Sequence, residues 1–144
     1  MSQRHPVQND HIMLITTNIA ERVPIFLDHG CAHEAVETLY RIQAMYPFFL
    51  YGFVIMPNHC HILMKARAPS SVSKIVGLYK RAVSHNIGRG SIWQPRFYMR
   101  IVHAPVQALS YIHQNPVRAH LVEKPEDYSW SSATGKWDIS NLYA

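Results

Sequence analysis

The chain has 144 residues, of which 48% are hydrophobic, and this length and composition are typical of one globular domain. It carries a formal net charge of +5, with 14 lysine and arginine residues against 9 acidic ones, which favours a partner that carries phosphate groups. The sequence has no apolar run near the ~20 residues that span a membrane, no apolar signal segment at its start, and too few cysteines for a disulfide framework. We therefore expect a single cytoplasmic domain over residues 1–144, with a core over about residues 10–116 and an extension over residues 117–144.

The first half of the chain predicts a strand, a helix and a hairpin of two further strands. Residues 11–19 are rich in β-branched side chains and predict the first strand. Across residues 30–45 apolar side chains recur at steps of three and four, which predicts an amphipathic helix. Residues 48–56 predict a strongly apolar second strand, and a proline-asparagine turn leads into a third strand over residues 60–66.

The second half predicts a helix, a strand and another helix. Residues 72–87 show apolar side chains at helical steps after a serine that can cap the first turn. Residues 97–103 predict a fourth strand, and residues 106–114 a helix that Pro116 is expected to close. This element order predicts an α+β fold, the ferredoxin-like split β-α-β sandwich, with helices on one face of an antiparallel sheet whose first and third strands are central, plus a C-terminal helix that carries Tyr111. Residues 123–137 are polar and predict an irregular tail wrapped back onto the domain.

The third strand begins with a pair of histidines separated by one cysteine. Side chains alternate between the faces of a strand, so His59 and His61 share one face, about 6.6 Å apart along the backbone, while Cys60 points the other way. Two imidazoles on one face can hold one cation, although the same spacing also fits an ordinary half-exposed polar face. A structural zinc site that includes a cysteine is disfavoured because Cys60 faces away and Cys31 begins a helix.

Basic residues dominate the chain between Lys65 and Arg118, a stretch without any aspartate or glutamate. A solvated cationic surface would normally include acidic residues, so their absence favours nucleic acid as the partner. Trp93, Phe97 and Tyr98 offer stacking faces among these charges, although Trp93 and Phe97 fit a core position equally well. The candidate DNA-binding residues are Lys65, Lys80, Arg81, Arg89, Arg96, Arg100 and Arg118.

Tyr111 and Asn115 lie four residues apart in the last predicted helix and therefore share one helix face. Taken alone, they fit a core tyrosine and a helix-end asparagine. Combined with His59 and His61, they describe a site in which a tyrosine hydroxyl attacks a DNA phosphorus while a cation stabilises the phosphate. Asn115 would be the third ligand, and two nitrogens with one amide oxygen suit Mn²⁺ better than Mg²⁺. Tyr79 is a rival nucleophile, but its spacing indicates packing.

Three segments resemble the single-tyrosine HUH transposases, specifically the REP-associated tyrosine transposases. They are VIMPNHCHILMK, IWQPRFYMRIV and YIHQNPVRAHLVEKPEDYSWSS, which lie in this order between Val54 and Ser132. The resemblance implies that His59 and His61 are the metal-binding histidines, with Cys60 where a bulky hydrophobic residue is usual, and that Tyr111 is the nucleophile. It places Asn115 where related insertion-sequence transposases carry a metal-binding glutamine.

The same resemblance implies the activity and the partners. It implies a ferredoxin-like fold and a Mg²⁺- or Mn²⁺-dependent enzyme that cleaves and rejoins single-stranded DNA near hairpins through a 5′-phosphotyrosine, at the nucleoid of a prokaryotic cell. Neither a nucleotide cofactor nor a membrane is expected. Some relatives exchange tyrosine helices within a homodimer whereas others act as monomers, and both assemblies stay open. The alternative from another class is a domesticated DNA-hairpin-binding protein that does not cut.

Overall fold

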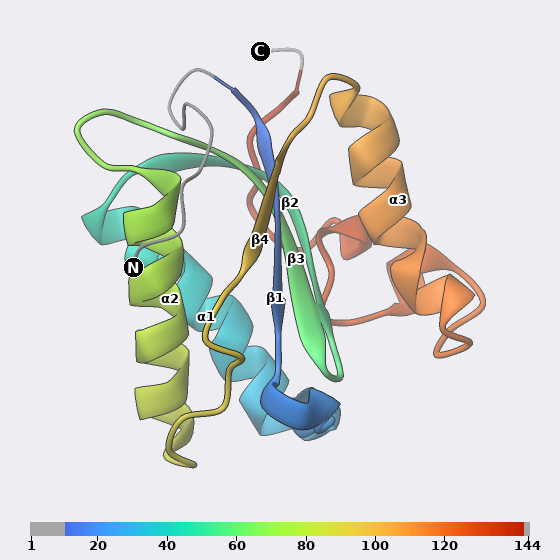
Figure 1. Ribbon diagram of the computed structural model, residues 1–144. Helices are drawn as coiled ribbons and strands as arrows, with labels where there is room; N and C mark the ends of the chain where they lie inside the picture. Colours follow the sequence, from blue (N-terminus) through green and yellow to red (C-terminus); the bar gives the residue numbers. More distant parts are fainter. Residues whose placement is uncertain (1–10, 143–144) are drawn as a thin grey trace.

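The computed structural model describes residues 11–142 and contains a four-stranded antiparallel sheet with helices on both faces (Figure 1). The strands are β1 Met13–Asn18, β2 Phe48–Met56, β3 His59–Ala66 and β4 Tyr98–Ile101, and the α-helices are α1 His29–Met45, α2 Val72–Ile87 and α3 Pro105–Arg118. The strand order is β2-β3-β1-β4, so β1 and β3 are central. This arrangement confirms the predicted ferredoxin-like fold.

The last helix extends beyond its predicted end, because Pro116 lies inside α3 and does not close it. A proline removes one helical hydrogen bond, and here the neighbouring bonds offset that loss. The Leu121 N–H donates to the Pro116 carbonyl at 2.9 Å, and the Ala119 N–H donates to the Asn115 carbonyl at 3.0 Å. The Pro116 ring is itself buried, so packing also favours the helical position. The prediction that Pro116 ends the helix was therefore wrong.

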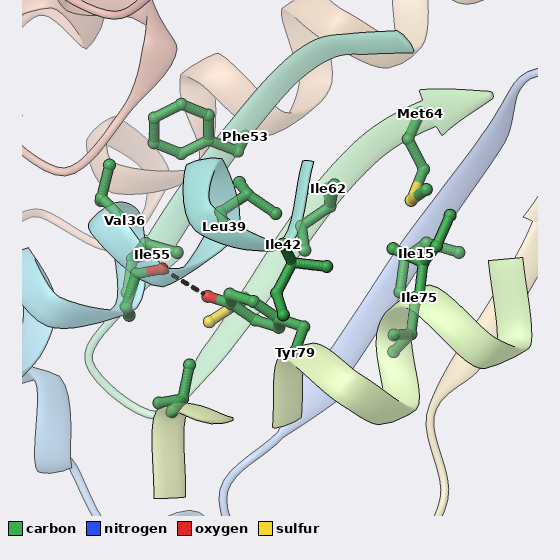
Figure 2. Packing of buried hydrophobic residues seen from close by; sticks show 14 of the residues in the cluster. Ile15, Val36, Leu39, Ile42, Phe53, Ile55, Ile62, Met64, Ile75 and Tyr79 are labelled. Carbon is green, nitrogen blue, oxygen red and sulfur yellow. Dashed lines mark hydrogen bonds between the residues drawn. The ribbon is translucent and has the colours of Figure 1, made fainter. Parts of the chain in front are cut away.

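The main core lies between the sheet and the helices α1 and α2. Side chains from one face of the strands, such as Ile15, Phe53 and Ile62, pack there against the two helices (Figure 2). Tyr79 of α2 is 1% exposed within this core, and its hydroxyl donates to the Ala35 carbonyl at 2.9 Å. Tyr79 is therefore a packing residue without access to solvent. Cys60 is fully buried on this same face, as the alternation along β3 predicts.

Helix α3 covers part of the opposite face of the sheet (Figure 1). It packs on β2 and β3, where Ala108 and Ile112 of α3 meet Val54 and Leu63 of the strands in a second apolar cluster. This second layer brings α3 over the face from which His59 and His61 project. Across residues 11–142 no helix has both the length and the apolarity that crossing a bilayer requires.

The tail after α3 is irregular and folds back on the outer edge of β2, as predicted. The Ile55 N–H donates to the Trp130 carbonyl at 2.8 Å, and the Tyr128 hydroxyl donates to the Ile55 carbonyl at 2.6 Å. An isolated bridge also joins Ser131 to Val54. These contacts pair part of an edge strand that would otherwise expose its backbone groups.

Two glycines provide matched tests of how closely the layers pack. A β-carbon at Gly52 of β2 would collide with Leu109 of α3 and lie 3.2 Å from the Ser132 hydroxyl, whereas one at Gly77 of α2 would meet no atom within 4 Å. We therefore expect Gly52→Ala to lower the free energy of unfolding by about 1–2 kcal/mol through overpacking. Gly77→Ala should raise it by about 0.5–1 kcal/mol, because alanine favours the helix.

Urea unfolding followed by circular dichroism measures both changes. Opposite signs for the two alanine variants are the expected result, and destabilisation by both would contradict the assigned difference in packing.

Candidate active site

The two histidines lie at the start of β3, on the face of the sheet that α3 covers. Their ring centroids are 4.9 Å apart. His61 pairs with Thr16 of β1 and His59 with Asn18, so the central strands present four polar side chains together. The alternation predicted for this segment is therefore observed, with both imidazoles on one face.

Each imidazole is oriented by an oxygen partner at Nδ1. His59 Nδ1 lies 2.7 Å from Asn58 Oδ1, and His61 Nδ1 lies 2.9 Å from Thr16 Oγ1. When Nδ1 carries the proton and donates to these oxygens, Nε2 keeps its lone pair. Metal-binding histidines are commonly fixed by such a partner on the nitrogen that does not bind the metal.

Burial keeps the two histidines neutral. It lowers the pKa of His59 from 6.5 to about 4, and the nearby positive charge of Arg22 acts in the same direction. The pKa of His61 is also lowered to about 4, first by burial and then by the charges of His59, Arg118 and Arg22. Neutral imidazole is the form that binds a metal ion.

These shifts predict how stability depends on pH in the absence of metal. The unfolded chain, with ordinary histidine pKa values near 6.5, binds more protons than the folded chain between about pH 7 and pH 4. The free energy of unfolding, measured in EDTA, should therefore fall as the pH drops from about 7 to about 4. Above about pH 7 the two histidines should no longer make it depend on pH. Urea unfolding at several pH values measures the effect. A His59→Ala/His61→Ala variant should show a weaker pH dependence, and an equally steep dependence would contradict the burial of neutral histidines.

Helix α3 brings Tyr111 and Asn115 to the histidine pair. Asn115 Nδ2 lies 3.3 Å from His59 Nε2, and the ring centroid of Tyr111 lies 6.4 Å from that of His61. Tyr111 is 53% exposed, so a ligand can reach its hydroxyl from solvent. The structure therefore brings together, within one chain, the four residues that the sequence singles out for chemistry.

The donor set at this point fits a divalent cation. The His59 Nε2 atom faces the Asn115 amide, whose oxygen and nitrogen exchange places by a half turn about the last side-chain bond, and the His61 ring lies beside the His59 ring. Among residues 11–142 no cluster of three or more His, Cys, Asp or Glu side chains could hold a metal ion. The Asn115 amide, 3.3 Å from His59 Nε2, is placed where it could act as a third, neutral ligand.

Two arginines lie beside this site from different elements. The Arg118 guanidinium carbon lies 4.2 Å from the Tyr111 ring centroid, and its Nη2 donates to the Tyr111 carbonyl at 2.6 Å. Arg22 Nη1 donates to Asn18 Oδ1 at 2.7 Å, next to His59 in the sheet. The guanidinium groups therefore place positive charge around a site that already presents two neutral imidazoles.

Arg22 and the residues that orient the histidines were not predicted from the sequence. Thr16, which orients His61, could have been found by pairing β1 with β3 in register, because it lies directly opposite that histidine. Asn58, which orients His59, directly precedes it in the sequence. Arg22 has a backbone φ of 57°, in the left-handed region that is costly for residues other than glycine. No pattern in the sequence signals this turn.

The remaining candidate DNA-binding residues divide into two groups. Arg100 of β4 is exposed and shares the histidine face of the sheet, because it pairs with Leu14. Lys65 lies on the same face of β3, but six residues from His59, which corresponds to about 20 Å of strand. These two residues extend the positive charge along the sheet.

The other basic residues lie around α2 and the loop that follows it. Lys80 Nζ donates to the Gln94 and Arg96 carbonyls at 2.9 and 3.4 Å, so this side chain holds the loop. Arg81 lines a cavity of about 430 Å³ beside it, and Arg96 is exposed. Arg89 pairs with Asp28 at 3.5 Å. The structure does not gather these residues at the histidine pair.

The aromatic residues of this segment differ in exposure. Trp93 is buried in the main core, where its indole N–H donates to the Lys80 carbonyl at 2.9 Å, and Phe97 is partly buried against the same core. Tyr98 is exposed. Of the three, only Tyr98 presents most of its ring to a ligand.

Comparison with known proteins assigns the family. The family described as "Transposase IS200 like" matches residues 7–115, and the chain belongs to this family. No curated protein matches the chain significantly.

Two solved structures share the fold. A REP-associated tyrosine transposase bound to a REP hairpin superposes with a TM-score of 0.80 at 21% identity, covering 100% of this chain and 96% of the other. A candidate transposase from Deinococcus radiodurans R1 gives a TM-score of 0.57 at 18% identity, covering 79% of this chain and 97% of the other. Both are similar to this chain over nearly their whole length.

Proposed function

We propose that the protein is a metal-dependent tyrosine transposase that cleaves and rejoins single-stranded DNA next to a hairpin. The observation that carries this proposal is the convergence of Tyr111 and Asn115 with His59 and His61 in a member of the IS200-like transposase family. The similarity to a transposase bound to a REP hairpin supports hairpin DNA as the substrate.

His59, His61 and Asn115 would hold the Mg²⁺ or Mn²⁺ ion. When bound, the ion supplies positive charge that stabilises the phosphate in the transition state. Asn58 and Thr16 orient the two imidazoles, and a proton on each Nδ1 would leave Nε2 available to the ion. The burial that lowers the histidine pKa values keeps these ligands unprotonated near neutral pH.

Tyr111 would act as the nucleophile. Its hydroxyl oxygen attacks the phosphorus and forms a new phosphorus–oxygen bond, the bond to the 3′ oxygen breaks, and the tyrosine proton passes to solvent while the 3′ oxygen takes up a proton. The phosphotyrosine keeps the energy of the broken bond, so a 3′ hydroxyl can later reverse the step without a nucleotide cofactor. Arg118 holds the Tyr111 backbone and places positive charge beside the ring.

A single chain supplies every residue that this proposal uses. Tyr111 approaches His61 of its own chain, so the site needs no residue from a second copy. This geometry favours cleavage by a monomer over the exchange of tyrosine helices within a homodimer.

One observation favours the alternative of a DNA-hairpin-binding protein that does not cut. The Asn115 Nδ2 group lies 3.3 Å from His59 Nε2 and can satisfy this nitrogen without a cation. Both candidates predict hairpin binding, and only the transposase predicts a covalent product.

The deciding experiment mixes the purified protein with a labelled single-stranded DNA that contains a hairpin, in Mn²⁺ or Mg²⁺. A protein–DNA adduct that survives denaturing electrophoresis and is absent in EDTA is the expected result. Binding of the hairpin without any adduct in either metal would favour the non-cutting alternative.

A further inference from the structure

A row of side chains crosses the sheet from the histidine pair to the edge strand β4. Thr16 of β1 lies opposite His61 on one side and opposite Tyr98 on the other. Directly paired residues project from the same face, and neighbouring strands are about 4.8 Å apart. Tyr98 therefore stands on the face of His61, about 10 Å away across two strand spacings.

This part of the sheet face is open. Helix α3 packs on β2 and β3, whereas β4 carries the exposed side chains of Tyr98 and Arg100. Tyr98 is 61% exposed and, with Leu14, Thr16, Met99 and Arg100, lines a hollow of about 330 Å³. Among residues 11–142 neither the Tyr98 hydroxyl nor the Arg100 guanidinium has a hydrogen-bond or ion-pair partner, so both can meet a ligand.

The chemistry of this hollow favours one nucleotide of a single strand. An exposed aromatic face stacks on a base, and an arginine two residues along the same strand face can bind the attached phosphate. The absence of acidic residues between Lys65 and Arg118 makes the surroundings attractive to a polyanion. Thr16 joins the hollow to the histidine pair, because its hydroxyl lies 2.9 Å from His61 Nδ1.

We propose that Tyr98 and Arg100 form a nucleotide-binding subsite, in which Tyr98 stacks on a base close to the scissile phosphate and Arg100 binds a phosphate of the same strand. This inference rests on the proposed function, because it assumes that single-stranded DNA crosses the histidine face of the sheet. Stacking depends little on base identity, so the subsite positions the strand and does not read its sequence.

The test compares two DNA hairpins with single-stranded extensions of about six nucleotides on each side. One carries ordinary bases, and the other has abasic extensions that keep every sugar and phosphate. Dissociation constants are measured by fluorescence anisotropy in EDTA with the Tyr111→Phe variant as the parent. Because the assay involves neither metal nor cleavage, its result is independent of whether a covalent adduct forms.

The parent should bind the base-bearing hairpin about tenfold more tightly than the abasic one. Tyr98→Phe should keep this ratio of affinities, because it keeps the aromatic ring. Tyr98→Ala and Tyr98→Leu should both bring the ratio close to one. Leucine keeps apolar bulk but lacks an aromatic face, so it separates stacking from apolar contact. Arg100→Ala should weaken both hairpins by a similar factor and reduce the slope of affinity against salt by about one.

Two control variants test whether the effect is confined to the hollow around Tyr98. Phe49→Ala removes another exposed aromatic side chain, at the far end of β2, and should leave the ratio unchanged. Arg41→Ala removes an arginine that pairs with Glu34 at 2.7 Å on α1 and should leave both affinities unchanged. The subsite would be overturned if the parent bound the two hairpins equally well or if Tyr98→Ala kept the preference for the base-bearing hairpin. It would also be overturned if Phe49→Ala lost this preference to the same extent as Tyr98→Ala.

Discussion

Replacing Tyr111 by phenylalanine should abolish the covalent protein–DNA adduct while leaving hairpin binding intact. The change removes only the hydroxyl that would attack the phosphorus, and the ring can keep its contacts with Arg118 and His61. Loss of a nucleophile commonly lowers the rate by far more than about a thousandfold, so no adduct should be visible. Denaturing electrophoresis measures the adduct, and a native gel with the same labelled hairpin measures binding.

Tyr46→Phe is the matched control, because Tyr46 lies at the end of α1 and packs on the main core, on the other face of the sheet from the histidine pair. This variant should form the adduct as the unmodified protein does. An adduct that persists in Tyr111→Phe would refute the assignment of Tyr111 as the nucleophile.

Replacing either histidine of the pair by alanine should remove metal-dependent cleavage. His59→Ala and His61→Ala each delete one of two imidazole ligands, and we expect the cleavage rate at a fixed Mn²⁺ concentration to fall by about a hundredfold or more. Hairpin binding in EDTA should change much less, since it needs no bound cation. Cleavage of a labelled strand, followed over a range of Mn²⁺ concentrations, measures both the rate and the metal requirement.

His103→Ala provides the control for these variants, because His103 is exposed and lies after β4, outside the site. Its cleavage rate and its metal requirement should match those of the unmodified protein. Unchanged metal dependence in both His59→Ala and His61→Ala would refute their role as ligands.

The fold could largely be predicted because its signals are local. Helix α2 has the predicted bounds, since Ser71 accepts a hydrogen bond from the Lys74 N–H at 3.2 Å and Gly88 ends the helix at a φ of 74°. The ends of β1 and β4 were less predictable: β1 occupies Met13–Asn18 within the predicted residues 11–19 and β4 Tyr98–Ile101 within residues 97–103. Strand ends depend on their partners, which sequence spacing does not give.

The candidate site could be predicted in two halves but not as a whole. The spacing of His59 and His61 places them on one strand face, and that of Tyr111 and Asn115 places them on one helix face. Their convergence depends on α3 packing across β2 and β3, which follows from tertiary contacts. Before the structure, the two halves were joined by the chemistry that the four residues could perform together and by the resemblance to a known family.

The basic residues show that the position of a charge in the sequence does not predict where its side chain lies. Lys80 and Arg100 look equivalent in the sequence, yet Lys80 binds backbone carbonyls of a loop whereas Arg100 is exposed on the histidine face. Arg22 lies outside the basic stretch and is nevertheless close enough to lower the pKa values of both histidines. Side-chain direction, which sequence position does not determine, separates these cases.

The most direct test of the proposed chemistry is to locate the DNA on the protein. The adduct formed with a hairpin-bearing strand in Mn²⁺ is digested with a protease and a nuclease, and the peptide that retains a nucleotide is sequenced by mass spectrometry. We predict that the nucleotide is attached through a phosphate to Tyr111. Attachment to Tyr98 or to any other residue, or the absence of a nucleotide-bearing peptide, would contradict the account.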